Sequence, residues 1–422
     1  MKSIVINHRA EKEKEGTYYT VPFEVPENVE ALTVTYKYNK ITQGITGHRK
    51  DANIIDLGIM DCDGRFIGWS GSARESVTVG EFSSTKGYFS KPIKSGTWNI
   101  IVGAYKICGD FTDIEYTIEF QEKKSRFYFG DLHIHTVASD GQYTAYEIAE
   151  KAKKIGLDFV ATADHNNYSE NFSLPKVDDL TFIPAVEWTH YKGHMNFFGV
   201  KAPFENSFIA NSHEEMKNLI DKARGRGAVV SVNHPKCTVC PYLWEDEETF
   251  DMMEIWNGPM RNVNMNGIKW WTELLSKGRK IPAVGGSDYH RTKSPVKLGN
   301  PVNAVYSPSR SAEDLLESIK KGHLYITSSV NGAKLFLKCG SFIMGDTVVS
   351  DKSYADLTVG AKNFGTAKII LVTTLKEREL TVKDGTCSVT VDRKEKFAYV
   401  KAIKNIFGKP MVTAITNPIY LK

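Results

Sequence analysis

The sequence predicts an α/β protein in which a βα barrel is flanked on both sides by antiparallel β-sandwich domains. Short runs of alternating apolar and polar residues fill the first and last parts of the chain, whereas strand-like and helix-like segments alternate in the middle. We therefore expect three domains, which cover residues 1–125, 126–325 and 326–422.

The first 125 residues show the alternation that is typical of half-buried strands, for example at residues 32–36, 76–79 and 114–118. Turn-forming pairs such as Asp63-Gly64 and Ser95-Gly96 lie between these runs, and no segment keeps a helical period. Many short strands with regular turns predict an antiparallel sandwich or jelly roll.

The middle region, residues 126–325, contains helix signals between apolar strand-like runs. Thr144 with Glu147 and Ser212 with Glu215 form capping-box patterns, and Ser311 is a further expected helix cap. A helix is also expected at residues 268–275. Expected strands cover residues 157–163, 181–186, 228–232, 252–256, 281–284 and 302–306. About seven repeated βα units predict a parallel sheet that forms a closed or nearly closed barrel.

Alternating patterns return in the last region, at residues 333–338, 357–359, 369–372 and 397–400. They predict a small antiparallel sandwich. This region has no cluster of candidate metal ligands, so we assign it roles in packing and in shaping the substrate site.

Composition narrows the function classes. The 54 Lys and Arg residues nearly balance the 50 Asp and Glu residues, so the formal charge is only +4 and a nucleic-acid partner is not expected. No apolar run reaches membrane-spanning length and no signal-peptide pattern is present, which predicts a cytoplasmic protein without a membrane partner. Among six cysteines, only Cys237 and Cys240 are close, and they predict a loop with two free thiols.

The most informative motif is the pair His133 and His135, followed by Asp140. Residues two apart on a strand point to the same side, so both imidazoles can face one metal ion. A lone pair of this kind is more often a surface feature, but further candidate ligands follow the other expected strands. The full set is His133, His135, Asp140, His165, Glu187, His194, His234, Asp288 and His290.

All nine are expected where a barrel strand meets its loop, which is the face that carries active sites in βα barrels. Burying so many ionisable groups without partners would cost several kcal/mol each. Two or three divalent cations explain the set, and a mixture of imidazole and carboxylate suits zinc, manganese or iron. Such cations can share a water that loses its proton near neutral pH.

Several neighbouring residues have two interpretations. Asp131 and Asp164 either orient imidazoles or cap strand ends. Arg291, Lys236 and Arg261 either bind a substrate phosphate or lie solvated on the surface.

The motifs Asp131-Leu-His-Ile-His-Thr136, Thr162-Ala-Asp-His165, Asn233-His-Pro235 and Ser287-Asp-Tyr-His290 occur in this order. The chain thereby resembles the PHP (polymerase and histidinol phosphatase) superfamily, and is most similar to its carbaryl-hydrolase-like metallohydrolases. The resemblance implies a distorted (β/α)7 barrel with three metals. It implies one site with His133, His135, Glu187 and Asp288. Glu187 would bridge to a second site with His194 and His234, and Asp140, His165 and His290 would form the third.

We therefore expect a metal-dependent phosphoesterase that uses a metal-bridging hydroxide on a small phosphorylated molecule, with Glu187, Asp288, His290 and Arg291 as catalytic residues. A carboxylic ester, carbamate or amide hydrolase on the same metals is the alternative. A glycan-binding or scaffold protein with structural metals is the alternative of another class. The two carboxylate oxygens of Glu187 make it the residue best able to hold two cations.

Overall fold

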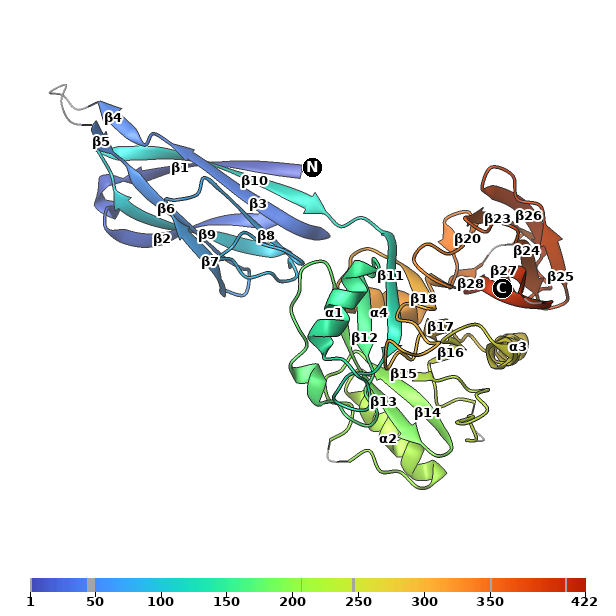
Figure 1. Ribbon diagram of the computed structural model, residues 1–422. Coiled ribbons are helices and arrows are strands. Elements are labelled where there is room, and N and C mark those ends of the chain that lie inside the picture. The colour runs from blue at the N-terminus through green and yellow to red at the C-terminus, as the bar shows by residue number, and fades with distance from the viewer. Residues whose placement is uncertain (1, 44–49, 206, 245–246, 350, 407) are drawn as a thin grey trace. The chain divides into compact units, whose positions relative to one another are not determined.

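Figure 1 shows the computed structural model, which describes all residues except 1, 44–49, 206, 245–246, 350 and 407. The chain divides into two compact units, Met1–Lys124 and Ser125–Lys422. Both units contain antiparallel strand pairs, and the α-helices of the described residues lie in the second unit. The chain is therefore an α/β protein rich in β-structure. The further domain boundary at residue 326 stays a prediction.

The first unit consists of two four-stranded antiparallel sheets. One has the order β1 (Lys2–Glu11), β10 (Phe111–Glu122), β3 (Val29–Tyr38) and β8 (Ser76–Gly80). The other has the order β2 (Thr17–Val25), β9 (Gly96–Lys106), β6 (Ile54–Met60) and β7 (Phe66–Gly71). A short helical turn, η1 (Lys12–Lys14), follows β1, and β4 (Ile41–Gln43) pairs with β5 (Lys50–Ala52).

Alternate residues of both sheets share one core, as Val34 and Trp98 show, because successive strand side chains point to opposite faces. The three expected strands fall within β3, β8 and β10, so the antiparallel prediction for this region is confirmed.

A 15-stranded mixed sheet organises the second unit. Its strand path runs β17 (Ala283–Gly286), β16 (Met252–Asn257), β15 (Val229–Val232), β14 (Gly193–Phe198), β13 (Thr181–His190), β12 (Phe159–Thr162), β11 (Arg126–Ile134), β18 (Val302–Ser307), β19 (Leu324–Thr327), β28 (Lys409–Thr416), β27 (Phe397–Ile406), β24 (Lys368–Thr373) and β25 (Glu377–Leu380). The short strands β22 (Thr347–Val348) and β29 (Ile419–Leu421) join beside β27.

Parallel pairing covers β11 to β13 and β15 to β17, whereas β14 is antiparallel to both of its neighbours. Among the described residues the strand path is open. The segment after β17 meets β11 through a bridge between Ile134 and Tyr289, and Asp288 N–H donates to the His133 carbonyl at 2.8 Å. The closed barrel therefore stays a prediction.

The helices of the second unit are α1 (Ala145–Lys154), α2 (His213–Gly225), α3 (Asn262–Ser276) and α4 (Ala312–Lys321), with the short turn η2 (Ser169–Phe172). The capping boxes of Thr144 and Ser212 are formed, and the Ser311 side chain accepts from Asp314 N–H. These three helix starts were predicted correctly. Helix α3 begins at Asn262, earlier than predicted. In its first turn the side chain of buried Asn264 donates to the carbonyls of Asn257 and Pro259.

A smaller antiparallel sheet has the order β21 (Phe342–Ile343), β20 (Lys334–Cys339), β23 (Tyr354–Lys362) and β26 (Thr386–Asp392). Its buried residues share a core with β24, β27 and β28, as Leu357 and Val400 show. The β-structure predicted for this region is confirmed. Of the described helices, none is both long enough and apolar enough to cross a bilayer.

Candidate metal centre

The structure brings the nine predicted ligands together on adjacent strands. His133 lies on β11 and His135 directly after it, Asp140 lies on the following loop, and His165 follows β12. His194 lies on β14, His234 follows β15, and Asp288 and His290 follow β17. The strand order places β13, which carries Glu187, between β11 and β12 on one side and β14 and β15 on the other.

Glu187 does not end its strand as predicted. Strand β13 pairs in parallel with β12 over Thr181–Pro184, and then continues to His190 as the antiparallel partner of β14. The hairpin extends the strand past the point where the apolar run stops, so Glu187 sits inside the sheet and is 1% exposed. The same hairpin places His194 on the opposing strand.

The two carboxylate oxygens of Glu187 face different imidazoles. Oε1 lies 3.1 Å from His194 Nδ1, 3.3 Å from His133 Nε2 and 3.4 Å from His234 Nε2. Oε2 lies 2.8 Å from His165 Nδ1 and 3.6 Å from His135 Nε2. This arrangement allows the carboxylate to serve two neighbouring cations, as we expect from its position in the strand order.

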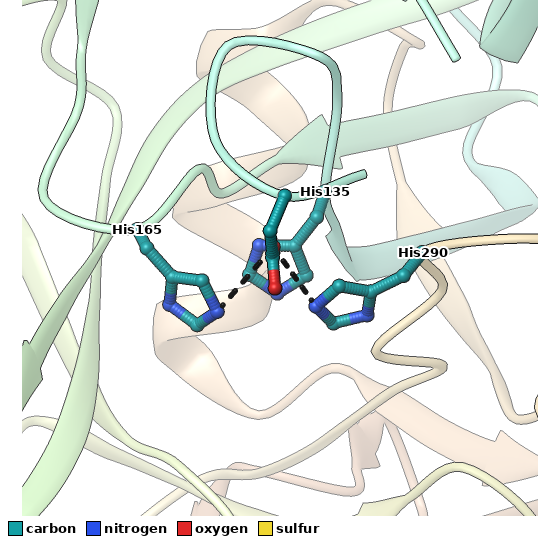
Figure 2. A group of neighbouring side chains, drawn as sticks. His135, His165 and His290 are labelled. Atoms are coloured by element: carbon teal, nitrogen blue, oxygen red, sulfur yellow. Dashed lines mark ion pairs between the residues drawn. The ribbon is translucent and has the colours of Figure 1, made fainter. Parts of the chain in front are cut away.

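Two aspartates complete the cluster. Asp288 Oδ1 lies 3.1 Å from His135 Nε2 and 3.7 Å from His133 Nε2. Asp140 Oδ1 lies 3.2 Å from His290 Nε2 and 3.7 Å from His165 Nε2. Figure 2 shows the imidazoles of His135, His165 and His290 converging from three segments of the chain.

The candidate ligands fall into four groups that share residues, and within each group the ligand atoms lie within 4.8 Å of one another. The groups are His135, Asp140, His165 and His290; His133, His135 and Glu187; His133, His234 and Asp288; and His194, His234 and Cys240. The third site expected from the family resemblance therefore also contains His135, and the group around His194 gains a sulfur. The assignment of each ligand to one ion stays a prediction.

Unsatisfied polar atoms in the cluster fit bound cations. Within the described residues, His133 Nε2, both ring nitrogens of His135 and Glu187 Oε2 are buried and make no hydrogen bond. Each such atom costs about 1–3 kcal/mol, and bound cations would satisfy one ring nitrogen of each histidine and the oxygen of Glu187. Imidazole nitrogens and carboxylate oxygens are the donor atoms that zinc, manganese and iron accept, so the residues fit the predicted metals.

The electrostatics of the cluster agree with this. Burial alone would lower the pKa of His133, but the carboxylates of Glu254 and Glu187 outweigh it and raise that pKa well above its usual value. Burial would raise the pKa of Glu187, but His133, His165 and His194 hold it well below the usual range. The neighbouring charges thus favour the charged forms of both His133 and Glu187, and a cation bound at His133 would compete with its proton.

Backbone features hold the site in place. A Cβ on Gly286 would lie 2.3 Å from the Cβ of His133, so only glycine allows β17 to approach β11 this closely. His234 and Asp288 have positive φ angles of 29° and 57°. A left-handed backbone conformation is strained at a non-glycine residue, and such strained residues are often found at functional sites.

Sequence reasoning missed Glu254, which lies on β16 and is 3% exposed. Its Oε1 lies 3.0 Å from His133 Nδ1, and its Oε2 accepts from His234 N–H at 3.1 Å. Glu254 therefore contacts the outer nitrogen of His133 and fixes which ring nitrogen faces the cluster. A signal was present, since Glu254 is a single acid within the otherwise uncharged strand Met252–Asn257.

Among the described residues, Asp131 and Asp164 accept hydrogen bonds from backbone N–H and hydroxyl groups and not from imidazoles. Asp131 accepts from the N–H groups of Ser287 and Gly299, both at 2.9 Å. Asp164 accepts from Thr136 N–H at 2.7 Å and from the Ser139 hydroxyl at 2.6 Å. Of the two interpretations, the structure supports the one in which they fix strand ends and loops.

Two cavities adjoin the cluster. One, of 760 Å³, is lined by Asp140, Gln142, Tyr143, Lys151, Arg291, Thr292 and Lys293. The other, of 380 Å³, is lined by residues that include His234, Lys236, Glu254, Asn257 and Arg261. The side chains of Arg291, Lys236 and Arg261 are thus available at cavities that open beside the ligands, although their role in binding stays a prediction.

A comparison with protein-family models gives no match, and a comparison with curated proteins gives none. Among solved structures, the chain is similar to a two-domain Bacteroides vulgatus protein that contains a predicted PHP-like metal-dependent phosphoesterase, with 16% identity, TM-score 0.40, and coverage of 69% of this chain and 95% of that one.

Two further similarities cover 40% of this chain. One is to a Bifidobacterium adolescentis protein proposed to be a metal-dependent phosphoesterase, with 19% identity, TM-score 0.28 and 90% of that chain covered. The other is to a Chromobacterium violaceum amidohydrolase with bound sulfate and no metal, with 14% identity, TM-score 0.30 and 89% of that chain covered. All three TM-scores are below 0.5.

Proposed function

We propose that the protein is a PHP-like metal-dependent hydrolase, and that it acts as a phosphoesterase on a small anionic molecule. The observation that carries the proposal is the set of four buried polar atoms without hydrogen bonds, which belong to the three candidate ligands His133, His135 and Glu187. A structural metal site usually holds one ion whose coordination positions are all filled by protein ligands. This cluster instead offers four ligand groups that share residues.

The chain's own residues would hold the ions. Glu187 Oε1 faces one set of imidazoles and Oε2 the other, so this carboxylate would be able to hold two neighbouring ions. His135, Asp140, His165 and His290 supply a further group at the more exposed side, where Asp140 is 57% exposed. When bound, divalent cations would activate water for attack on the substrate and neutralise the charge that builds up as its bond breaks.

Positively charged lysine and arginine side chains along the cavity walls favour a phosphate ester over a neutral carbonyl substrate. Lys151, Arg291 and Lys293 line the cavity that contains Asp140, while Lys236 and Arg261 line the cavity that contains His234. Arginine and lysine stabilise phosphate through charge-assisted hydrogen bonds, and a carbamate or carboxylic ester offers no such charge. These side chains therefore orient an anionic group toward the ligands.

The test is a substrate screen with purified full-length protein loaded separately with zinc, manganese or iron. Phosphomonoesters and phosphodiesters are compared with carboxylic esters and carbamates, and Glu187→Gln serves as the inactive control. We expect turnover of a phosphate ester that is lost in Glu187→Gln. Turnover of only carbonyl substrates would replace phosphoesterase by the carboxylic ester, carbamate or amide alternative. A metal-loaded protein that hydrolyses none of them would favour structural metals.

A further inference from the structure

The Cys-x-x-Cys loop after β15 lies directly beside a predicted metal ligand. Cys237 Sγ and Cys240 Sγ are 3.3 Å apart, and both residues are free thiols at partly exposed positions. A turn holds the pair together, since Cys237 N–H donates to the His234 carbonyl at 2.8 Å and Tyr242 N–H donates to the Pro235 carbonyl at 3.0 Å. The two sulfurs thus meet without a large movement of the backbone.

Cys240 also contacts the imidazole of His234. Its Sγ lies 3.6 Å from His234 Nδ1, while His234 Nε2 faces Glu187 Oε1 at 3.4 Å. Cys240 therefore contacts the Nδ1 atom of His234, which points away from Glu187. Glu254 contacts the Nδ1 atom of His133 in the same way. A partner at this position fixes the tautomer of a metal-binding histidine, and its removal typically lowers metal affinity by about 10–100-fold.

Small oxidants can reach this loop. Val239, between the two cysteines, is 89% exposed, and Cys237, Thr238 and Val239 line the 380 Å³ cavity. We propose that Cys237 and Cys240 are a redox modification site, in which a peroxide converts the two thiols to a disulfide and thereby weakens metal binding at His234. The effect on metal binding rests on the metal-ligand part of the proposed function, and it is independent of which substrate is hydrolysed.

The chemistry balances with hydrogen peroxide as the oxidant. One cysteine sulfur attacks a peroxide oxygen, the O–O bond breaks, and a sulfenic acid and one water form. The second sulfur then attacks the sulfenic sulfur, so the S–S bond forms and another water leaves. Two thiols and one peroxide thus give one disulfide and two waters. When Nε2 binds a metal, His234 Nδ1 carries the proton and donates it to the Cys240 sulfur. Formation of the S–S bond brings the two sulfurs from 3.3 Å to about 2.05 Å apart, and this displaces the Cys240 sulfur from its position against Nδ1.

The experiment treats the purified, metal-loaded full chain with hydrogen peroxide and follows two quantities besides activity. Peptide mass spectrometry looks for the loss of two hydrogen atoms in the segment that contains Cys237 and Cys240. Competition with a chromophoric chelator measures the affinity of zinc. We expect the disulfide to form, the affinity of the most weakly held zinc ion to fall by about 10–100-fold, and a thiol reductant to restore both.

Two variants sharpen the result. Cys237→Ser keeps the contact between Cys240 and His234 but cannot form the disulfide, so its zinc affinity should not respond to peroxide. Cys387→Ser removes a partly exposed thiol on β26 and should behave as wild type. The proposal is overturned if no disulfide forms, if the disulfide forms with unchanged zinc affinity, or if Cys237→Ser loses zinc affinity in peroxide as the wild type does. None of these readouts needs a substrate, so failure here is distinct from failure of the proposed hydrolase activity.

Discussion

Glu254→Gln removes one charge from a buried carboxylate without changing its size. The carboxylate contacts His133 Nδ1 at 3.0 Å, His234 N–H at 3.1 Å and Asn257 Nδ2 at 3.3 Å. A glutamine amide has one acceptor oxygen and one NH₂ group in place of two acceptors. In one orientation the NH₂ opposes the two donors of His234 and Asn257. In the other it faces His133 Nδ1 and stabilises the tautomer whose proton lies on Nε2.

Either orientation should weaken metal binding. A buried donor without an acceptor costs about 1–3 kcal/mol, and loss of a partner behind a metal-binding histidine typically costs about 10–100-fold in affinity. Since about 1.4 kcal/mol corresponds to a factor of ten, the two magnitudes agree. We therefore expect Glu254→Gln to fold and to bind its metals about 10–100-fold more weakly.

The assay is chelator competition on full-length protein, supported by metal analysis with mass spectrometry. Glu273→Gln is the matched control, because Glu273 lies exposed on α3 and the same change there should leave metal affinity as in wild type. Wild-type affinity in Glu254→Gln would refute the role assigned to Glu254 behind His133.

Three other predictions concern the cluster and the first unit. Glu187→Gln should lower metal content by at least one ion and activity by orders of magnitude, whereas His290→Ala should disturb mainly the group around Asp140. Mass spectrometry of the bound metals in both variants separates these cases. Full metal content in Glu187→Gln would contradict the bridging role. Gly286→Ala should lower the free energy of unfolding by several kcal/mol, as measured by chemical denaturation, because its Cβ would overlap β11; a loss below about 1 kcal/mol would show that the strands can separate at little cost. Burial would raise the pKa of Asp61, but its ion pair with Lys91 and backbone N–H bonds lower that pKa below 3.8. This carboxylate therefore stabilises the fold above about pH 4 and ceases to do so as pH falls through its folded-state pKa, so Asp61→Asn should reduce the acid-induced loss of stability seen by circular dichroism; an unchanged pH slope would contradict this.

Much of the cluster could be predicted from sequence because its residues follow apolar runs. His165, His234 and Asp288 each stand just after a buried strand, and helix caps such as Thr144 announce the helices between them. These features are determined within a few residues of sequence, by the spacing of apolar side chains along a strand or helix and by the residues that cap a helix.

What could not be predicted depends on tertiary pairing. The extension of β13 past Glu187 is caused by its hairpin with β14, and an apolar run cannot show where such pairing ends. The roles of Glu254 and Cys240 arise because β16 and the loop after β15 approach imidazoles from other strands. Asp131 was assigned two interpretations because its acceptor role depends on distant N–H groups of Ser287 and Gly299.

The central claim is that these side chains form a cluster that binds two or more divalent cations with Glu187 between them. Anomalous X-ray scattering from crystals grown with zinc tests it most directly, because each ion gives its own peak. The account predicts at least two peaks, each about 2.0–2.2 Å from its ligand atoms, with the two oxygens of Glu187 bound to different ions. A single peak, or peaks that do not contact Glu187, would contradict it.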